Sequence, residues 1–157
     1  MTKLNFEISK HYTIAQKATK ESKLRLLHFK IMHNIYPTNI LLCKMKIRTN
    51  ILCDNCQVPD FIEHFFVECG LIEGFWKYIS SYIQSSINIE VKLNSRDILL
   101  GLINSEHNNI KSREIDYING IILLGKHCIT KLRYGKLKNI YLIFDLELNL
   151  RKKLLIQ

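Results

Sequence analysis

Apolar residues recur at helical spacing in four segments of the chain. The first segment, residues 16–35, has its stripe at Leu24, Leu27, Ile31 and Ile35, widened by Leu26 and Phe29. Residues three and four apart share one face of an α-helix, so this pattern predicts a helix with a buried face. The sequence Tyr36-Pro37-Thr38 then breaks the helix. Thr38 or Asn39 is a suitable cap for a second short helix that runs through Ile47.

The other three helical patterns lie in the second half of the chain. Their apolar positions are Leu71, Phe75, Ile79, Ile83 and Ile87; then Ile115, Ile118, Ile122, Ile129 and Leu132; and then Leu137, Tyr141, Phe144, Leu148 and Leu155. Ser112, followed by Glu114 and Asp116, is typical of a helix start, and Gly135 is a suitable stop. A short apolar turn over 98–103 and a polar loop over 104–111 precede this start. We expect the last two helices to form an antiparallel hairpin.

These patterns predict a mainly α fold, because the chain shows no convincing run of strands and no internal repeat. We divide it into an N-terminal basic segment (1–20), a small helical domain (21–90) and a helical C-terminal tail (91–157). The 157 residues are 47% hydrophobic and 24% charged, which is ordinary for a globular protein.

Two segments bear on where the protein resides. The clean apolar run Ile121–Leu124 is far shorter than the ~20 residues of a membrane span. The sequence MTKLNFEISK at the amino terminus lacks the apolar stretch of a signal peptide. We therefore expect an intracellular protein, cytoplasmic or nuclear, with no membrane partner.

The net charge of +9 is unevenly distributed. Residues 1–52 hold ten Lys and Arg against two acids, a net of +8. Residues 53–110 hold three against eight, a net of −5, and residues 111–157 hold ten against four, a net of +6. Basic segments of this size favour a partner that carries phosphates. A solvated, lysine-rich helix surface would give the same pattern.

Three of the five cysteines fall close together, with a histidine between them. Cys53, Cys56, His64 and Cys69 form the pattern C-x2-C-x7-H-x4-C. The two-residue gap lets a tight turn aim two sulfurs at one ion, and the set as a whole is a usual closed structural zinc site. The alternative is that one or two of these cysteines are ordinary buried thiols. The sequence thus predicts one structural Zn²⁺ in a Cys3His-clipped loop of a small helical domain.

Four protein ligands leave no open position for water, so hydrolytic zinc chemistry is disfavoured. Three thiolates give the centre a charge of about −1, in a loop that also carries Asp54, Asp60, Glu63 and Glu68. Such a loop is a poor phosphate binder and is better interpreted as a clip between basic helices. We expect Phe65, Phe66, Phe75 and Trp76 to form a small core beside the metal, although an aromatic cluster could also stack on bases.

Taken in order, these motifs resemble the reverse transcriptase zinc-binding domain, which lies downstream of the polymerase in many non-LTR (LINE-type) retrotransposon proteins. The similarity covers residues 22–80, and a looser similarity extends to the tail. It is carried by Leu26-Leu27-His28-Phe29-Lys30, Tyr36-Pro37-Thr38, Cys53-x2-Cys56, Glu63-His64-Phe65-Phe66-x2-Cys69 and Phe75-Trp76. The middle gap of seven residues distinguishes the loop from the short retroviral zinc knuckle, whose middle gap is four.

The resemblance implies association with nucleic acid, supports the four zinc ligands and transfers no catalytic residue. It also implies an upstream reverse transcriptase polymerase domain as a partner. The polymerase's Asp-Asp pair does not occur in this chain, because Asp145 is followed by Leu146. Asp145 and Glu147 are interpreted as exposed acids on the last helix. His127 and Cys128 are neighbours that could suggest a thiol nucleophile with its base. Adjacent residues on a helix point about 100° apart, so these two side chains cannot form such a catalytic pair.

The sequence therefore predicts a zinc-stabilised accessory domain that binds RNA or DNA through basic helices and has no catalysis or small-molecule substrate of its own. The segments expected to bind are 17–48 and 126–153. The candidate binding residues are Lys17, Lys20, Lys23, Arg25, Lys30, Lys44, Lys46 and Arg48. The alternative is a zinc-stabilised protein-interaction or scaffold domain, whose binding would be insensitive to salt.

Overall fold

The computed structural model describes residues 9–155, with side chains as far as Lys153. Residues 1–8, on which the expectation about a signal peptide rests, lie outside this range, and so does the side chain of Leu155. The elements are α2 (Ile14–Ala18), α3 (Ser22–Met32), α4 (Asn39–Lys44), the π-helical η1 (His64–Glu68), the 3-10 turn η2 (Gly70–Ile72), α5 (Phe75–Ile87), α6 (Ser95–Leu100), α7 (Ser112–Tyr134) and α8 (Ile140–Leu155). Residues 9–12 are also helical.

The mainly α prediction is confirmed. Over residues 9–155 the only β-type pairing is an isolated antiparallel bridge between Leu52 and Pro59. In the same range, no helix has both the length and the apolar character needed to cross a bilayer.

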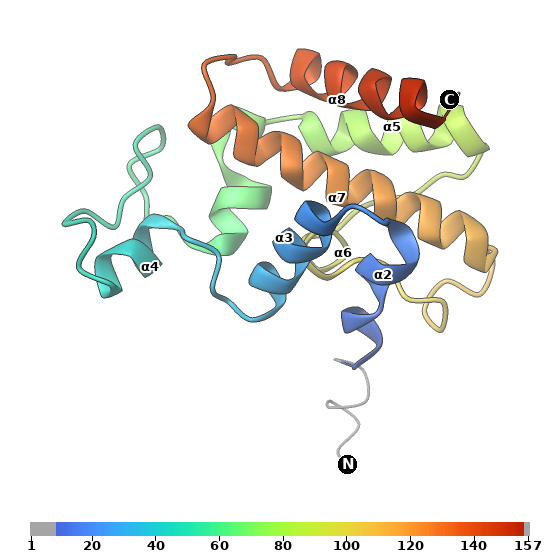
Figure 1. Ribbon diagram of the computed structural model, residues 1–157, viewed down its shortest axis with the longest axis horizontal. Helices are drawn as coiled ribbons and strands as arrows, with labels where there is room; N and C mark the ends of the chain where they lie inside the picture. Colours follow the sequence, from blue (N-terminus) through green and yellow to red (C-terminus); the bar gives the residue numbers. More distant parts are fainter. Residues whose placement is uncertain (1–8, 156–157) are drawn as a thin grey trace.

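Helix α7 is the centre of the fold. In Figure 1 it lies between α5 and α8 on one side and α2 and α3 on the other, and it packs against all four. Its predicted face is buried, and in its middle every residue from 121 to 126 is buried. A helix enclosed in this way must be apolar nearly all round, and 121–124 reads Ile-Ile-Leu-Leu. The predicted stop is also confirmed, because α7 ends at Tyr134 with Gly135 as its C-cap.

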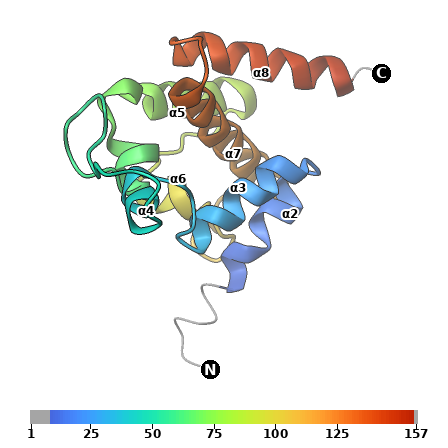
Figure 2. The ribbon, with the colours of Figure 1, turned by 60° about the vertical axis from the view of Figure 1, so that its left-hand side comes forward.

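The predicted hairpin is confirmed as well. Helix α8 returns along α7 after the turn over 135–139, and it also lies beside α5 (Figures 1 and 2). Phe144 of α8 packs edge-on against Phe75, Tyr78 and Tyr82 of α5. A single cluster of buried apolar side chains extends from Leu27 to Phe144 and includes residues on both sides of residue 90.

The predicted stripe of α3 is only partly correct. Leu24, Leu27 and Ile31 are buried, but Ile35, Leu26 and Phe29 are exposed. Ile35 leaves the stripe because α3 ends at Met32 and Asn34 takes a left-handed conformation, φ 54°. Leu26 and Phe29 face outward because His28 takes part of the buried face of the helix.

The predicted face of α8 also needs correction. The buried residues on this helix are Ile140, Ile143, Phe144 and Glu147, whereas Tyr141 is exposed. Leu137 precedes the helix and is exposed too. The interpretation of Glu147 as an exposed acid is therefore wrong, while Asp145 is exposed as expected. Glu147 is tolerated inside because Lys131 and Arg151 both bind its carboxylate.

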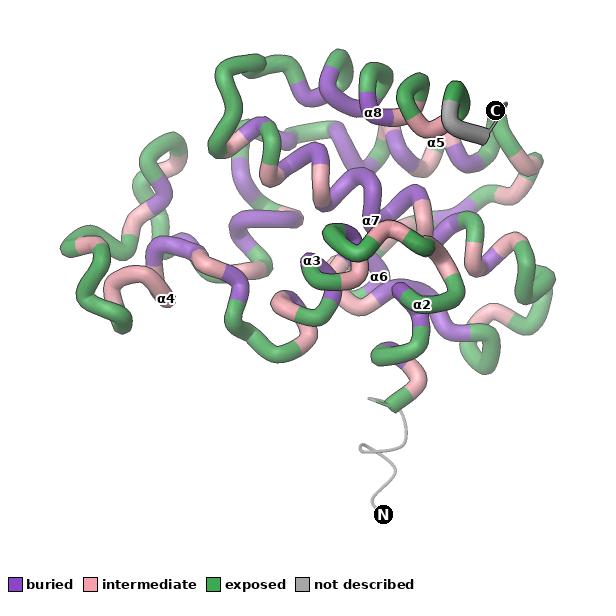
Figure 3. Tube along the Cα trace, in the orientation of Figure 1, coloured by how far each residue is buried: buried purple, intermediate pink, exposed green. Residues whose placement is uncertain are grey.

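Helix α4 and the segment that follows it project from the helical body. Figure 3 shows this arm mostly in the colours of exposed and intermediate residues, in contrast to the buried α7. Thr38 caps α4 as predicted, because its hydroxyl accepts a hydrogen bond from the Leu41 N–H at 3.5 Å. The helix ends at Lys44, earlier than the predicted Ile47. The apolar side chains of α4 are only half-buried, and the buried residue of this helix is Asn39.

Candidate metal centre

The four residues singled out from the spacing converge in the structure. The ligand atoms of Cys53, Cys56, His64 and Cys69 all lie within 4.8 Å of one another and could hold a metal ion. The sulfur of Cys69 lies 3.9 Å from that of Cys53 and 3.7 Å from that of Cys56. Cys53, Cys69 and His64 are buried, and Cys56 is partly exposed.

A short hairpin aims the first two sulfurs at this point. The Cys53 N–H donates to the Val58 carbonyl at 2.7 Å, and the Gln57 N–H donates back to the Cys53 carbonyl at 2.9 Å. Gln57 adopts a left-handed conformation, φ 57°, which closes the turn over the Cys-x2-Cys step. The two arms of the hairpin meet in an isolated antiparallel bridge between Leu52 and Pro59.

The other two ligands come from a helical segment with a widened turn. His64 begins the π-helical η1, and Cys69 directly follows it, with the Cys69 N–H bound to the His64 carbonyl at 2.8 Å. Such widened turns are rare and occur frequently at functional sites. Here the widened turn brings together the His64 imidazole and the Cys69 thiol, which are five residues apart in the sequence.

Two further observations fit a metal ligand set. The Nε2 atom of His64 is buried and has no hydrogen-bond partner, which is costly unless another group, such as a cation, occupies its lone pair. The sulfur of Cys56 accepts hydrogen bonds from the Gly70 N–H at 3.2 Å and from the Asn55 side-chain amide at 3.4 Å. Donors of this kind orient ligands and stabilise the thiolate form that binds metal.

The local environments set the acidity of two thiols in opposite directions. Burial raises the pKa of the Cys69 thiol to about 12. Burial also raises the pKa of Cys56, but the hydrogen bonds from Asn55 and Gly70 outweigh it, so that this pKa lies below its ordinary value. A metal ion at the centre would hold both sulfurs as thiolates, because ligation requires the deprotonated form.

A buried ion pair attaches the loop to α7. The Arg133 guanidinium donates to Asp60 Oδ1 at 2.9 Å, and the Asn39 N–H donates to Asp60 Oδ2 at 3.1 Å. Asp60 is only 1% exposed, so its charge depends on these donors. The guanidinium also lies 4.2 Å from the centroid of the Phe65 ring. One carboxylate thus joins the loop, the start of α4 and the end of α7.

No local sequence pattern indicates this attachment, because Asp60 and Arg133 are 73 positions apart. The acidic character of the loop is correspondingly reduced. Arg133 neutralises Asp60, and Arg48 pairs with Asp54 at 3.0 Å, while Glu63 and Glu68 stay exposed.

The aromatic core expected beside the metal is present. Phe65, Phe66, Phe75 and Trp76 are all buried, and Trp76 Nε1 donates to the Phe66 carbonyl at 2.7 Å. Gly125 of α7 lets the indole approach closely, since a Cβ at this position would lie 3.0 Å from Trp76 Cη2. Tyr36 packs edge-on against both Phe65 and Phe66, with centroids 5.0 Å apart in each pair. These rings hold η1 against the helical body and are not available for stacking on bases.

The eight basic candidates differ in what they contact. Lys17, Lys20, Lys23, Lys44 and Lys46 are exposed, and Lys30 is half-buried; none of these six forms an ion pair within residues 9–155. Arg25 donates to the carbonyls of Thr19 and Gln16 at 2.8 and 3.2 Å. Arg48 is shared between Asp54 and the Asn39 side chain. Six lysines on or beside α2, α3 and α4 therefore keep an uncompensated charge.

Several basic residues of segment 126–153 have partners inside the protein, whereas the exposed Lys136, Lys152 and Lys153 form no ion pair within residues 9–155. Binding by this segment stays a prediction. Lys126 is fully buried, and its ammonium donates to the Leu99 carbonyl at 3.0 Å. Arg133 is bound to Asp60. Arg151 forms a two-pronged pair with Glu21, at 2.6 and 2.7 Å, and also binds Glu147. These three side chains are occupied by partners within the fold.

Cys128 is fully buried as well, and burial raises the pKa of its thiol to about 12. Its neighbour His127 has a pKa below its ordinary value, because burial disfavours the charged ring. A thiol of this kind is protonated at neutral pH and inert as a nucleophile.

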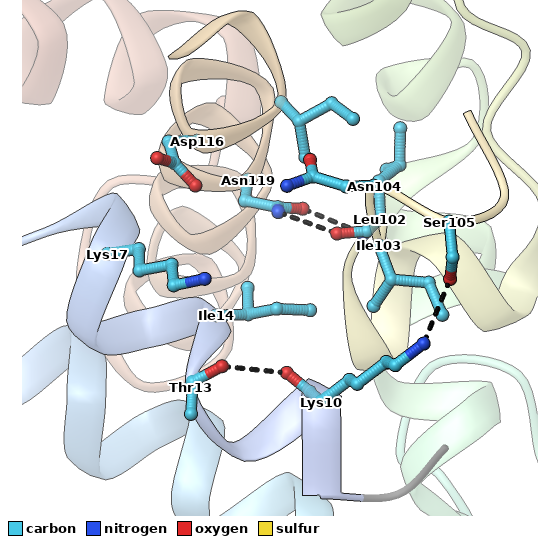
Figure 4. A pocket seen from close by; sticks show the side chains of 11 residues that line it. Lys10, Thr13, Ile14, Lys17, Leu102, Ile103, Asn104, Ser105, Asp116 and Asn119 are labelled. Carbon is cyan, nitrogen blue, oxygen red and sulfur yellow. Dashed lines mark hydrogen bonds between the residues drawn. The ribbon is translucent and has the colours of Figure 1, made fainter. Parts of the chain in front are cut away.

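A cavity of about 300 Å³ lies away from the metal centre, between α2, the segment after α6 and the start of α7 (Figure 4). Its lining includes Lys10, Lys17, Asp116 and Asn119. The Asn119 amide is committed to the backbone of Leu102, to which it donates at 2.9 Å and from which it accepts at 2.7 Å. Asn119 thus holds the turn after α6 against α7, and the expectation of no small-molecule substrate stays a prediction.

Comparison of the chain with models of known protein families, with curated proteins and with solved structures finds no match. The likeness to the reverse transcriptase zinc-binding domain thus rests on the motifs of this sequence.

Proposed function

We propose that this chain is a zinc-stabilised accessory module that binds RNA or DNA and performs no catalysis of its own. Zinc is the metal that the donor set favours. Three thiolates and one imidazole are a usual structural zinc set, and a tetrahedron with metal–sulfur bonds of about 2.3 Å has sulfur–sulfur edges of about 3.8 Å. The two sulfur separations of 3.7 and 3.9 Å fit that edge.

The observation that carries the nucleic-acid proposal is the sorting of the basic residues by partner. Six lysines along α2, α3 and α4 have no carboxylate partner, and residues 9–52 contain a single acid, Glu21, which Arg151 already occupies. A phosphate backbone is a partner that neutralises such a row, with release of its counterions. The likeness of the motifs to a domain of retrotransposon reverse transcriptases supports the same function, with a polymerase domain as partner.

The test is a binding titration of the metal-loaded chain with labelled RNA and DNA at increasing salt. Binding should be detectable at low salt, change little with sequence and weaken steeply as salt rises. Converting Lys20, Lys23 and Lys30 to Gln should reduce the slope of log binding constant against log salt concentration. The reduction should correspond to the loss of up to about three phosphate contacts. The matched control converts the exposed Lys77, Lys92 and Lys111, which lie outside both segments expected to bind, and should leave the slope unchanged. Absence of binding at low salt contradicts the proposal.

A protein-interaction module is the second candidate, and the projecting arm favours it. Met45, Ile47, Ile51, Val58 and Phe61 are all exposed large apolar side chains around α4 and the metal loop. A surface of this kind is suited to a protein partner. The two functions differ in their response to salt, because an apolar interface is insensitive to it whereas phosphate binding is not.

A further inference from the structure

Three aromatic rings from two helical segments form a row on the surface of the protein. Phe29 and His33 stand one turn apart on and just after α3, with ring centroids 4.2 Å apart. Tyr12, from the helical residues that precede α2, also contacts His33, with ring centroids 5.4 Å apart. All three residues are exposed, Tyr12 by 38% and Phe29 by 48%. We call Tyr12, His33 and Phe29 the ring row.

The backbone beneath the ring row is fixed by buried neighbours. His11 and His28, which precede Tyr12 and Phe29 in the sequence, are each only 2% exposed. The His28 ring binds the His11 carbonyl at 2.9 Å, and the His11 ring binds the Leu100 carbonyl at 3.0 Å. Adjacent helical residues point about 100° apart, so anchoring one histidine inward directs the following aromatic residue outward. The rings are therefore held on a rigid support.

The rings serve no purpose in the core, since the apolar contacts of α3 are made by Leu24, Leu27 and Ile31. Two lysines of α3 flank this face of the helix. Lys30 follows Phe29 and points about 100° away from it, and Lys23 lies two helical turns before Lys30 on the same face as Lys30. Neither lysine forms an ion pair with the described residues. Exposed rings among uncompensated cations are the combination that holds unpaired bases by stacking and their backbone by charge.

We propose that the ring row is a base-stacking site for single-stranded nucleic acid, with Phe29 and Tyr12 as its stacking residues and Lys23 and Lys30 as phosphate contacts. This rests on the proposed nucleic-acid function and goes beyond it, because it assigns the contact to unpaired bases. A duplex hides its base faces within the stack, whereas a single strand can place them on the rings.

The experiment measures fluorescence anisotropy of the full, metal-loaded chain with a labelled single strand of about 12 nucleotides, the corresponding duplex and an abasic strand of the same length. Replacing Phe29 or Tyr12 with Ala should weaken single-strand binding about five-fold or more. Phe29→Tyr should keep the affinity of the natural chain, and Phe29→Leu should lose as much as Phe29→Ala, since a leucine is apolar but offers no π-face. On the abasic strand all these variants should bind alike.

The matched control is Phe61→Ala, which removes the same ring from a comparably exposed position in the acidic metal loop and should leave single-strand affinity unchanged. Thermal melting of each variant shows that the fold is retained. The proposal is overturned if Phe29→Ala binds the single strand as tightly as the natural chain, or if it loses equal affinity for the abasic strand. Full binding by Phe29→Leu also overturns it, because that result marks an apolar contact of the kind a protein partner makes. If the natural chain binds both duplex and single strand at low salt, these outcomes refute only the proposed stacking site and leave the proposed nucleic-acid function intact. If the natural chain binds neither, the proposed function is refuted together with the stacking site.

Discussion

The ion pair between Arg133 and Asp60 makes a quantitative prediction about how the metal loop is attached to the helical body. Arg133→Met keeps the aliphatic stem over Phe65 and removes the charge. Asp60, at 1% exposure, is then left with one donor, the Asn39 N–H at 3.1 Å. Removing one partner of a buried pair costs about 3–5 kcal/mol, because the remaining charge is uncompensated. Since the Arg133 side chain is 12% exposed, we expect the low end of this range, about 3 kcal/mol.

The assay is urea unfolding of the metal-saturated chain, with metal concentration held fixed because metal binding itself stabilises the fold. A loss of about 3 kcal/mol corresponds to a fall of roughly 6–12 °C in Tm for a chain of this size. The control is Arg96→Met, which breaks the solvent-exposed pair with Glu106 at 2.9 Å. Exposed pairs contribute about 0–1 kcal/mol, so this variant should unfold almost as the natural chain does.

A double-mutant cycle separates the pair from other effects of each substitution. Asp60→Asn combined with Arg133→Met removes both charges, and should cost less than the sum of the two single variants, with a coupling of about 1.5–3 kcal/mol. The reasoning is refuted if Arg133→Met falls within about 1 kcal/mol of Arg96→Met, or if the two single effects simply add.

Three further results are expected. Cys69→Ser should reduce bound metal from about one ion per chain to near none and speed hydrogen exchange across residues 53–69; unchanged metal content would refute the site. Interactions with Lys131 and Arg151 outweigh burial and lower the Glu147 pKa to about 2. The stability that the ionised Glu147 contributes to the folded chain is therefore complete above pH 4.5 and is lost as pH falls toward 2. Acid titration of Glu147→Gln should lack this loss, and an identical acid midpoint would contradict it. Burial lowers the Lys126 pKa from 10.5 to about 7, so the folded chain binds fewer protons than the unfolded chain between these values. The free energy of unfolding in urea should therefore be about 3 kcal/mol higher for Lys126→Met than for the natural chain at pH 7, and this difference should shrink as pH rises to 10. A difference that stays constant with pH would show that the lowered Lys126 pKa is not its cause.

The elements that the sequence predicts well are those in which apolar periodicity and burial coincide. The face of α7 from Ile115 to Leu132 is buried as expected, and its limits follow the predicted start and stop. The metal site is predicted equally well from the sequence, because the spacing of its ligands is a local property of the chain. Its four residues needed only the hairpin at Gln57 and the widened turn at His64 to converge.

Several of the failures share one cause, which is that polar side chains occupy buried positions. His28 on α3, Glu147 on α8 and Lys126 on α7 all point inward, and each has its polar group bound there. Hydropathy assigns such residues to the surface and therefore rotates the expected face of the helix. Their partners come from distant parts of the chain, as in the bond from Lys126 to Leu99, so no local pattern announces them.

The distribution of acids decides which basic residues can meet a phosphate. Residues 111–157 have a net charge of +6, yet Arg133, Lys131 and Arg151 are bound to Asp60, Glu147 and Glu21. Two of these three acids lie in other segments of the chain, so folding brings them to the C-terminal helices. Glu21 is the one acid among residues 9–52, and its pairing with Arg151 removes it from the lysines around it. The pairing that stabilises α8 thereby leaves α2, α3 and α4 more positive than their own sequence indicates. Replacing Arg151 should accordingly lower both stability and the positive potential beside Lys20 and Lys23, since it frees the Glu21 carboxylate.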